Sequence, residues 1–412
     1  MPLTESSAAT PPASLARRFV AAWVFLVISS GMGLLLRLQV FVPWAPLPYG
    51  HLLHAHSHVA FLGWVFNAFF VVALRHFLPV GSGRRLGRLW WVLQVSVLGM
   101  LISFPLQGYG PVSIAFSTLH VGASAVFAWR LWRETTATAA ARFHLRAALV
   151  FLLLSAAGPV ALGPLAAAGL RDAPAYTLAV YWYLHCQYNG WFVFFLQALA
   201  LERRAGDGHT GDPAAAVRAG RWLFAGSLLS YALSTLWSEP PALVHLVAGL
   251  GGAAQLIGAL LLARVLAGPS LRTAVNRHPL LAIAAGAWLL KTLLQFAAVL
   301  PGLLTLAHQR FVAIAFLHLV FLGLVIPALV AWADDAGWFA PGLTRRVGLG
   351  LFLAGAALTE ALLVAPAVAS LAGWPLGIPL AEGLLAGAVG TAAGLGVMGL
   401  ALRGRGRTGD SR

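Results

Sequence analysis

Three stretches of this sequence follow one pattern: HVAFLGW at residues 58–64, HCQYNGW at residues 185–191 and HLVFLGL at residues 318–324. Each has a glycine five residues after its histidine and lies within an apolar run. The histidines are 127 and 133 residues apart, about one third of the 412-residue chain. A second polar series, 62, 60 and 64 residues further along, consists of His120, His245 and Glu382. Similarity at a regular interval is typical of internal repeats, so the sequence predicts three related units with polar groups at matched positions.

The composition places these repeats in a membrane. The chain is 60% hydrophobic and 9% charged, with a mean hydropathy of +0.83, whereas soluble domains carry roughly a quarter charged residues. A soluble fold is therefore excluded. The formal net charge of +15 fits arginines that orient membrane helices better than it fits a nucleic-acid partner. The single cysteine, Cys186, excludes a disulfide framework and a CxxC metal site.

Crossing a bilayer takes about 20 apolar residues, and the sequence holds twelve such runs between its turn and charge clusters. We therefore predict an all-α integral membrane protein, residues 1–412 forming a single domain of twelve transmembrane helices, the first of them retained rather than cleaved. Three four-helix units, residues 18–133, 145–266 and 279–402, would be related by pseudo-threefold symmetry. The predicted helices lie near residues 18–40, 50–74, 89–105, 112–133, 145–168, 176–200, 217–237, 242–266, 279–300, 308–332, 344–368 and 377–402.

The basic residues predict how these helices are oriented. If the N-terminus is cytoplasmic, 23 of the 27 Lys and Arg residues fall in cytoplasmic segments, as positive-inside sorting requires. Both termini would then be cytoplasmic, and the protein would be a multi-pass protein of the cell (inner) membrane. The bilayer is its first partner, and its large apolar exterior would also accommodate a homo-oligomer. The basic residues left at outer ends or within a helix are Arg37, Arg171, Lys291 and Arg310.

The three repeated histidines share one depth. The helix that carries each histidine enters the membrane from the outer face. The histidine lies about eight to ten residues from that end, or roughly 12–15 Å deep at 1.5 Å per residue. Histidine is costly in hydrocarbon, which favours a functional set over ordinary packing histidines. The glycine of each motif is expected to allow close helix packing. His51 and His54 share a helix face with His58 by i, i+3, i+7 spacing, and His56 points elsewhere.

Twelve helices, histidines in the second, sixth and tenth, and a threefold repeat together resemble subunit I of the heme–copper oxidase superfamily. That superfamily includes the cytochrome oxidases and nitric oxide reductases, and the local sequence looks most like the C-type oxidases and their diverged stand-alone relatives. The resemblance implies one b-type heme held axially by His58 and His318, with His56 or His54 as substitutes for His58. The heme propionates would face outward, where the available cations are Arg37, Arg171 and Arg310.

The sequence also departs from that family. Phe316 stands two residues before His318, where the family has the ligand of its high-spin heme. Pro240 and Pro241 stand where its copper-binding histidine pair is expected, and Tyr188 follows His185 at a spacing that does not clearly keep the family's histidine–tyrosine crosslink. Phenyl and pyrrolidine side chains offer a metal no lone pair. The resemblance therefore implies electron transfer or binding of a diatomic gas (nitric oxide or oxygen), without conventional oxygen reduction and with no catalytic residue identified.

Two other interpretations remain open. His185 with His54, His120 or His245 could build an unorthodox redox site around copper, zinc or iron, since imidazole suits all three metals. Alternatively, the repeat could surround the histidine-lined path of a transporter. The chain has no CxxCH attachment site, so an electron donor would be a separate redox protein or a quinol.

Overall fold

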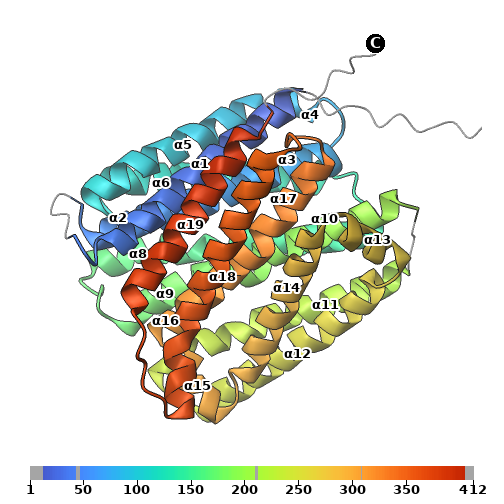
Figure 1. Ribbon diagram of the computed structural model, residues 1–412. Helices are drawn as coiled ribbons and strands as arrows, with labels where there is room; N and C mark the ends of the chain where they lie inside the picture. Colours follow the sequence, from blue (N-terminus) through green and yellow to red (C-terminus); the bar gives the residue numbers. More distant parts are fainter. Residues whose placement is uncertain (1–12, 43–46, 209–211, 308, 404–412) are drawn as a thin grey trace, which may run out of the picture.

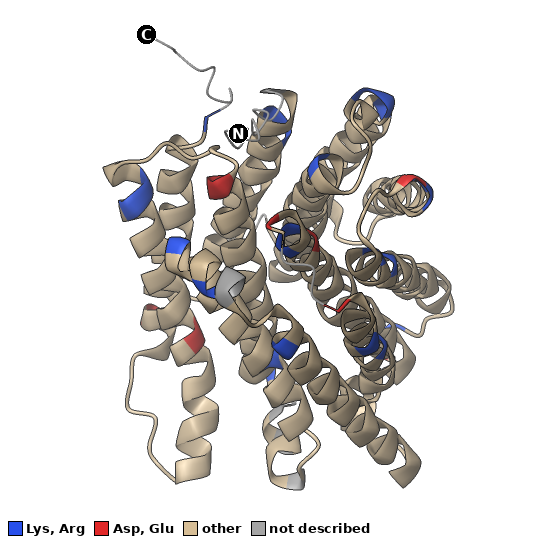
Figure 2. Ribbon diagram, turned by 90° about the vertical axis from the view of Figure 1, so that its right-hand side faces the viewer, with Lys and Arg blue, Asp and Glu red and all other residues tan. Residues whose placement is uncertain are grey.

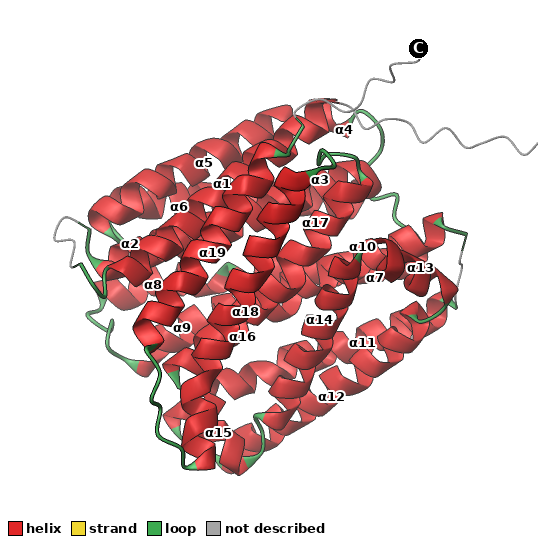
Figure 3. Ribbon diagram, viewed as in Figure 1, coloured by secondary structure: helices red, strands yellow, loops and turns green. Residues whose placement is uncertain are grey.

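The computed structural model describes residues 13–42, 47–208, 212–307 and 309–403, and these residues are almost entirely helical (Figures 1 and 3). His209 and His308 lie outside them. Three long helices are interrupted by π segments (η1, η2 and η4), and a 3₁₀ segment (η3) ends a fourth. The elements are α1 (Ala13–Leu38), α2 (Tyr49–His58), η1 (Val59–Val65), α3 (Phe66–His76), α4 (Ser82–Arg85), α5 (Gly87–Gln107), α6 (Pro111–Glu134), α7 (Ala139–Ser155), α8 (Ala157–Ala167), α9 (Pro174–His185), η2 (Cys186–Trp191), α10 (Phe192–Gly206), α11 (Pro213–Leu229), η3 (Ser230–Ser238), α12 (Ala242–Leu266), α13 (Pro269–Arg277), α14 (Pro279–Ala297), α15 (Pro301–Ala307), α16 (Arg310–His318), η4 (Leu319–Val325), α17 (Ile326–Asp335), α18 (Leu343–Ala372) and α19 (Leu380–Leu400).

All twelve predicted runs are helical, and ten helices of the described residues are long and apolar enough to cross a membrane. The two predicted spans that are not among these ten correspond to the helical runs 174–206 and 213–238. The first carries Gln187 and Asn189 in its middle, and the second ends in the 3₁₀ helix η3. The ten are Ser14–Leu38, Tyr49–His76, Gly87–Gln107, Pro111–Glu134, Ala139–Ala167, Ala242–Leu266, Pro279–Ala297, Arg310–Asp335, Leu343–Ala372 and Leu380–Leu400.

Helix packing follows the same scheme three times along the chain. An interrupted helix packs against the helix that precedes it, as η1 does on α1, η2 on α7 and η4 on α14. Two further helices pack against each other, as in the pairs α5–α6, α11–α12 and α18–α19. The last helix returns to the first, so α19 lies beside α1 in Figure 1. The indole Nε1 of Trp23 in α1 donates to the carbonyl of Leu395 in α19 at 3.2 Å.

A π-helix begins directly after each of the three repeated histidines. The π-turn is rare and is often found at functional sites. The glycine of each motif lies inside it. A Cβ on Gly63 would come within 2.9 Å of Phe25, and one on Gly190 within 2.1 Å of Phe151. The expected role of these two glycines in close helix packing is confirmed.

Aromatic side chains fill the centre of the molecule. The residue three positions after each repeated histidine is aromatic, and the ring centroid of Phe61 lies 5.2 Å from that of Tyr188 and 6.0 Å from that of Phe321. Phe192 lies 5.7 Å from Phe61 and completes the cluster. Three separate interrupted helices therefore meet at one apolar axis.

Charged residues are sparse, and most of the ribbon in Figure 2 is tan, the colour of residues other than Lys, Arg, Asp and Glu. Several ion pairs gather at the end of the bundle where α6, α10 and α17 finish. Arg85 pairs with Glu134 at 3.1 Å, Arg345 with Asp334 at 2.8 Å, and Arg203 with Asp335. This end of the bundle suits water and lipid head groups rather than hydrocarbon.

Candidate functional site

His56 in α2 is held by a notch in α1. Its Nδ1 lies 2.7 Å from the carbonyl oxygen of Ser29, to which it donates. One turn further along α1, the absence of a side chain at Gly33 makes room for the ring, because a Cβ there would lie 3.1 Å from Cε1 of His56. A backbone acceptor at Nδ1 fixes the tautomer and leaves Nε2 with its lone pair, as in histidines that bind metals.

His318 ends α16 and faces three polar groups from other helices. His56 and Arg37 lie close enough to interact with it electrostatically. Glu360 of α18 places Oε1 3.8 Å from Nδ1 of His318. Both of these atoms are buried without a hydrogen-bond partner among the described residues. Buried polar atoms left unpaired are costly, so this pair suits an arrangement in which the carboxylate accepts the proton of Nδ1.

Arg37 and Arg310 gather beside Tyr49, at the same end of α1, α2 and α16. Nη2 of Arg310 donates to the Tyr49 hydroxyl at 3.2 Å, and its guanidinium lies 5.7 Å from the centroid of that ring. Arg37 interacts electrostatically with both of them. Neither arginine forms an ion pair with a residue that the structure describes. The third propionate candidate, Arg171, is exposed between α8 and α9 and makes no hydrogen bond or ion pair to this group.

His58 occupies different surroundings from His56. Its Nδ1 lies 2.9 Å from the carbonyl of His54 in its own helix, and its ring centroid lies 4.3 Å from that of Phe104 in α5. His120 of α6 interacts with it electrostatically. The structure therefore turns His58 toward α5 and α6, and places His56, its substitute in the sequence-based expectation, within electrostatic range of His318.

His120 is buried beside His58. Its Nδ1 is 3.0 Å from the hydroxyl of Ser124, and its ring also approaches the backbone of Leu62. His54 lies nearer the end of the bundle, with its ring centroid 4.6 Å from that of Tyr109. Burial raises the pKa of the Tyr109 hydroxyl further above its ordinary value. His51 packs against Gly108, whose φ of +58° requires glycine.

His185 belongs to a third polar cluster. Its Nε2 lies 2.7 Å from the carbonyl of Ser227, and its Nδ1 lies 3.1 Å from the amide nitrogen of Asn189. Lys291 of α14 interacts with it electrostatically and is itself buried, donating to Oε1 of Gln255 at 3.3 Å. Both ring nitrogens of His185 thus already have protein partners.

The structure does not bring His185, His54, His120 and His245 together. His245 is exposed on α12, and the other three lie in the separate surroundings given above. Within the described residues no group of three or more His, Cys, Asp or Glu side chains is arranged to hold a metal ion. A second metal site of His185 with His54, His120 or His245 therefore stays a prediction.

Two features of the site were not part of the sequence-based expectation. Glu360 is an acidic residue inside a predicted helix, but its approach to His318 joins residues 42 positions apart on two helices and carries no local signal. The notch at Ser29 and Gly33 could not be predicted either, because small residues four apart are common in membrane helices.

No protein-family model matches the sequence, and no curated protein matches it.

Proposed function

We propose that this chain is a heme-binding membrane protein similar to heme–copper oxidase subunit I, in which one b-type heme lies between His56 and His318. The observation that carries the proposal is the approach of these two histidines from α2 and α16, one with its Nδ1 fixed by Ser29 and the other beside Glu360. Two neutral imidazoles on facing helices are a common axial pair for low-spin heme iron.

The chain's own residues have distinct roles in this proposal. Ser29 and Gly33 would orient the His56 ring. Glu360, whose Oε1 lies 3.8 Å from Nδ1 of His318, would accept a hydrogen bond from Nδ1–H after a small side-chain shift, which would strengthen that imidazole as a ligand. Arg37, Arg310 and the Tyr49 hydroxyl bind the two propionates, which supply the carboxylates that these arginines lack among the described residues. Bound heme would supply one-electron redox chemistry or an iron coordination position for a gas.

The proposed setting is the cell inner membrane, with twelve spans and both termini cytoplasmic. The runs 174–206 and 213–238 would be the two spans beyond the ten already apparent, because each lies alongside helices that qualify. The site of Arg37 and Arg310 would then be near the outer face, within reach of a redox protein or a quinol as electron donor.

Electron transfer or diatomic-gas binding suits this site better than conventional oxygen reduction. Phe316 of α16 offers no second iron ligand two residues before His318. Pro240 and Pro241 connect η3 to α12 and cannot bind copper. The cluster around His185, whose ring nitrogens are both hydrogen-bonded, does not replace them.

The test is the pyridine hemochrome spectrum of protein purified from cells supplied with heme precursor. Wild type is expected to contain one b-type heme per chain, and His318→Ala to lose most of it. His245→Ala removes an exposed histidine and serves as the matched control, with unchanged heme content. A colourless wild-type protein would contradict the proposal and would favour the histidine-lined transporter.

A further inference from the structure

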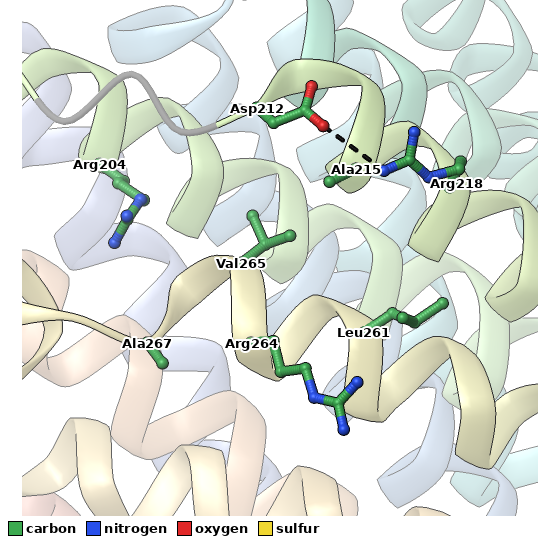
Figure 4. Close-up of a pocket in the computed structure, with 8 residues that line it drawn as sticks. All are labelled: Arg204, Asp212, Ala215, Arg218, Leu261, Arg264, Val265 and Ala267. Carbon is green, nitrogen blue, oxygen red and sulfur yellow. Dashed lines mark hydrogen bonds and ion pairs between the residues drawn. The ribbon is translucent and has the colours of Figure 1, made fainter.

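A pocket of about 400 Å³ opens where α10 and α12 end and α11 begins, at the opposite end of the bundle from Arg37 and Arg310 (Figure 4). Three helices each contribute one arginine to its lining: Arg204 from α10, Arg218 from α11 and Arg264 from α12. Asp212 is the acidic residue among the lining side chains, which therefore carry a net positive charge of two. Such a convergence of guanidinium groups favours a phosphate ligand.

The local hydrogen bonds hold two of the arginines at the pocket. Nη1 of Arg204 donates to the carbonyl of Leu266, at the end of α12, at 3.0 Å. Nη2 of Arg218 lies 3.4 Å from Asp212, which also caps α11 by accepting from the backbone N–H of Ala214 at 2.8 Å. Arg264 is exposed and makes no hydrogen bond or ion pair with any residue that the structure describes.

The pocket is apolar between its arginines and adjoins a surface suited to lipid chains. Figure 4 shows Leu261 and Val265 among the three guanidinium groups. Further along α12, toward the middle of this membrane span, Ile257 and Leu260 are exposed. A ligand seated here could place a phosphate against the arginines and hydrocarbon against α12.

We propose that this pocket binds the head group of an anionic phospholipid, with the phosphate on Arg218 and Arg264 and the acyl chains along α12. Basic pockets between membrane helices at the head-group level are suited to such lipids. The apolar lining and the adjoining lipid-facing surface favour a phospholipid over free phosphate. The proposal does not depend on heme.

The test measures thermal denaturation of the full-length protein in detergent mixed with increasing phosphatidylglycerol. A saturable rise in melting temperature is expected, with little rise from phosphatidylcholine, whose choline cancels the phosphate charge. The double variant Arg218→Gln/Arg264→Gln is expected to need about 30-fold more phosphatidylglycerol for the same rise, since the two arginines near an anionic head group together contribute about 2 kcal/mol. Arg264→Gln alone gives a smaller shift in the same direction and serves if the double variant is unstable.

Arg221→Gln is the matched control, because Arg221 is exposed on α11 and does not line the pocket. It is expected to keep the wild-type lipid response. Equal responses to both lipids, or an unchanged response in the two pocket variants, would overturn the proposal. A full response to inorganic phosphate alone would overturn it as well and would indicate a site for a free anion.

Discussion

His56 is oriented by two small residues of α1, and this makes the heme proposal testable without touching a ligand. Ser29 supplies the acceptor for Nδ1, and Gly33 supplies the space for the ring. On the other side of the site, Nδ1 of His318 and Oε1 of Glu360 lie 3.8 Å apart, and both atoms are buried without a hydrogen-bond partner among the described residues. At the scale of single residues, the account requires that these supporting contacts govern heme affinity.

Gly33→Val is expected to weaken heme binding by about 10–100-fold, the usual effect of disturbing a residue that orients a metal ligand. The new side chain would occupy the position of the His56 ring, whose Cε1 lies 3.1 Å from a Cβ at this site. Heme titration of the purified apoprotein measures the change. Gly31→Val in the same helix meets no atom within 4 Å and should bind heme as wild type does. Equal affinities in the two variants would show that the notch does not orient the ligand.

At the scale of elements, the three interrupted helices share a histidine, a π-turn and a glycine inside that turn, which is buried at Gly63 and Gly190 and partly exposed at Gly323. In two of them the glycine lies against a phenylalanine of the preceding helix, Phe25 or Phe151. The closest approach is at Gly190. A π-turn adds one residue to the helix and rotates everything beyond it, so these glycines fix how each interrupted helix meets the centre.

Gly190→Ala is therefore expected to destabilise the protein by about 1–3 kcal/mol, as overpacking of a close contact does. Its Cβ would lie 2.1 Å from Cγ of Phe151, which must move. Gly286→Ala in α14 is the control, because its Cβ meets nothing within 4 Å, and alanine there should be neutral or stabilising by up to about 1 kcal/mol. Thermal denaturation in detergent compares the two. Similar melting temperatures for the two variants would show that the π-turn accommodates the added methyl group at residue 190 without loss of stability.

Hydropathy and spacing were enough to predict the helices and the three histidine motifs, because both depend on local sequence. The choice between His56 and His58 was not predictable, since it depends on which face of α2 meets α1 and which meets α5. His58 packs against Phe104 of α5, and His56 donates to the Ser29 carbonyl of α1. Whether His185 joins His54, His120 or His245 in a second metal site was equally beyond the sequence, because equal depth in the membrane does not by itself bring side chains to one axis, and aromatic rings occupy the centre.

At the scale of the whole molecule, the chain closes on itself through α1 and α19, and its arginine-lined pocket and its candidate heme site lie at opposite ends. This arrangement gives the bundle two chemically different faces. It also makes the membrane topology a requirement of the account, because the loops at 172 and 207 must lie on opposite sides of the bilayer if the run 174–206 crosses it.

Cysteine labelling tests that topology in a Cys186→Ala background. Asp207→Cys is expected to react with a membrane-impermeant maleimide only when the cytoplasmic face is accessible, and Asp172→Cys only from outside, because both positions are exposed at opposite ends of one helical run. The charge distribution sets the direction. Labelling of both positions from the same side would show that the run 174–206 does not cross the membrane.

The most direct test of the central claim is the reduced-minus-oxidised absorbance spectrum of His56→Ala beside that of His58→Ala. The account predicts that His56→Ala loses the sharp α band of low-spin heme, because it removes an axial imidazole facing His318. His58→Ala should keep that band, because the His58 ring packs against Phe104, 4.3 Å away, and lies within electrostatic range of His120. An unchanged α band in His56→Ala, together with its loss in His58→Ala, would contradict the assignment.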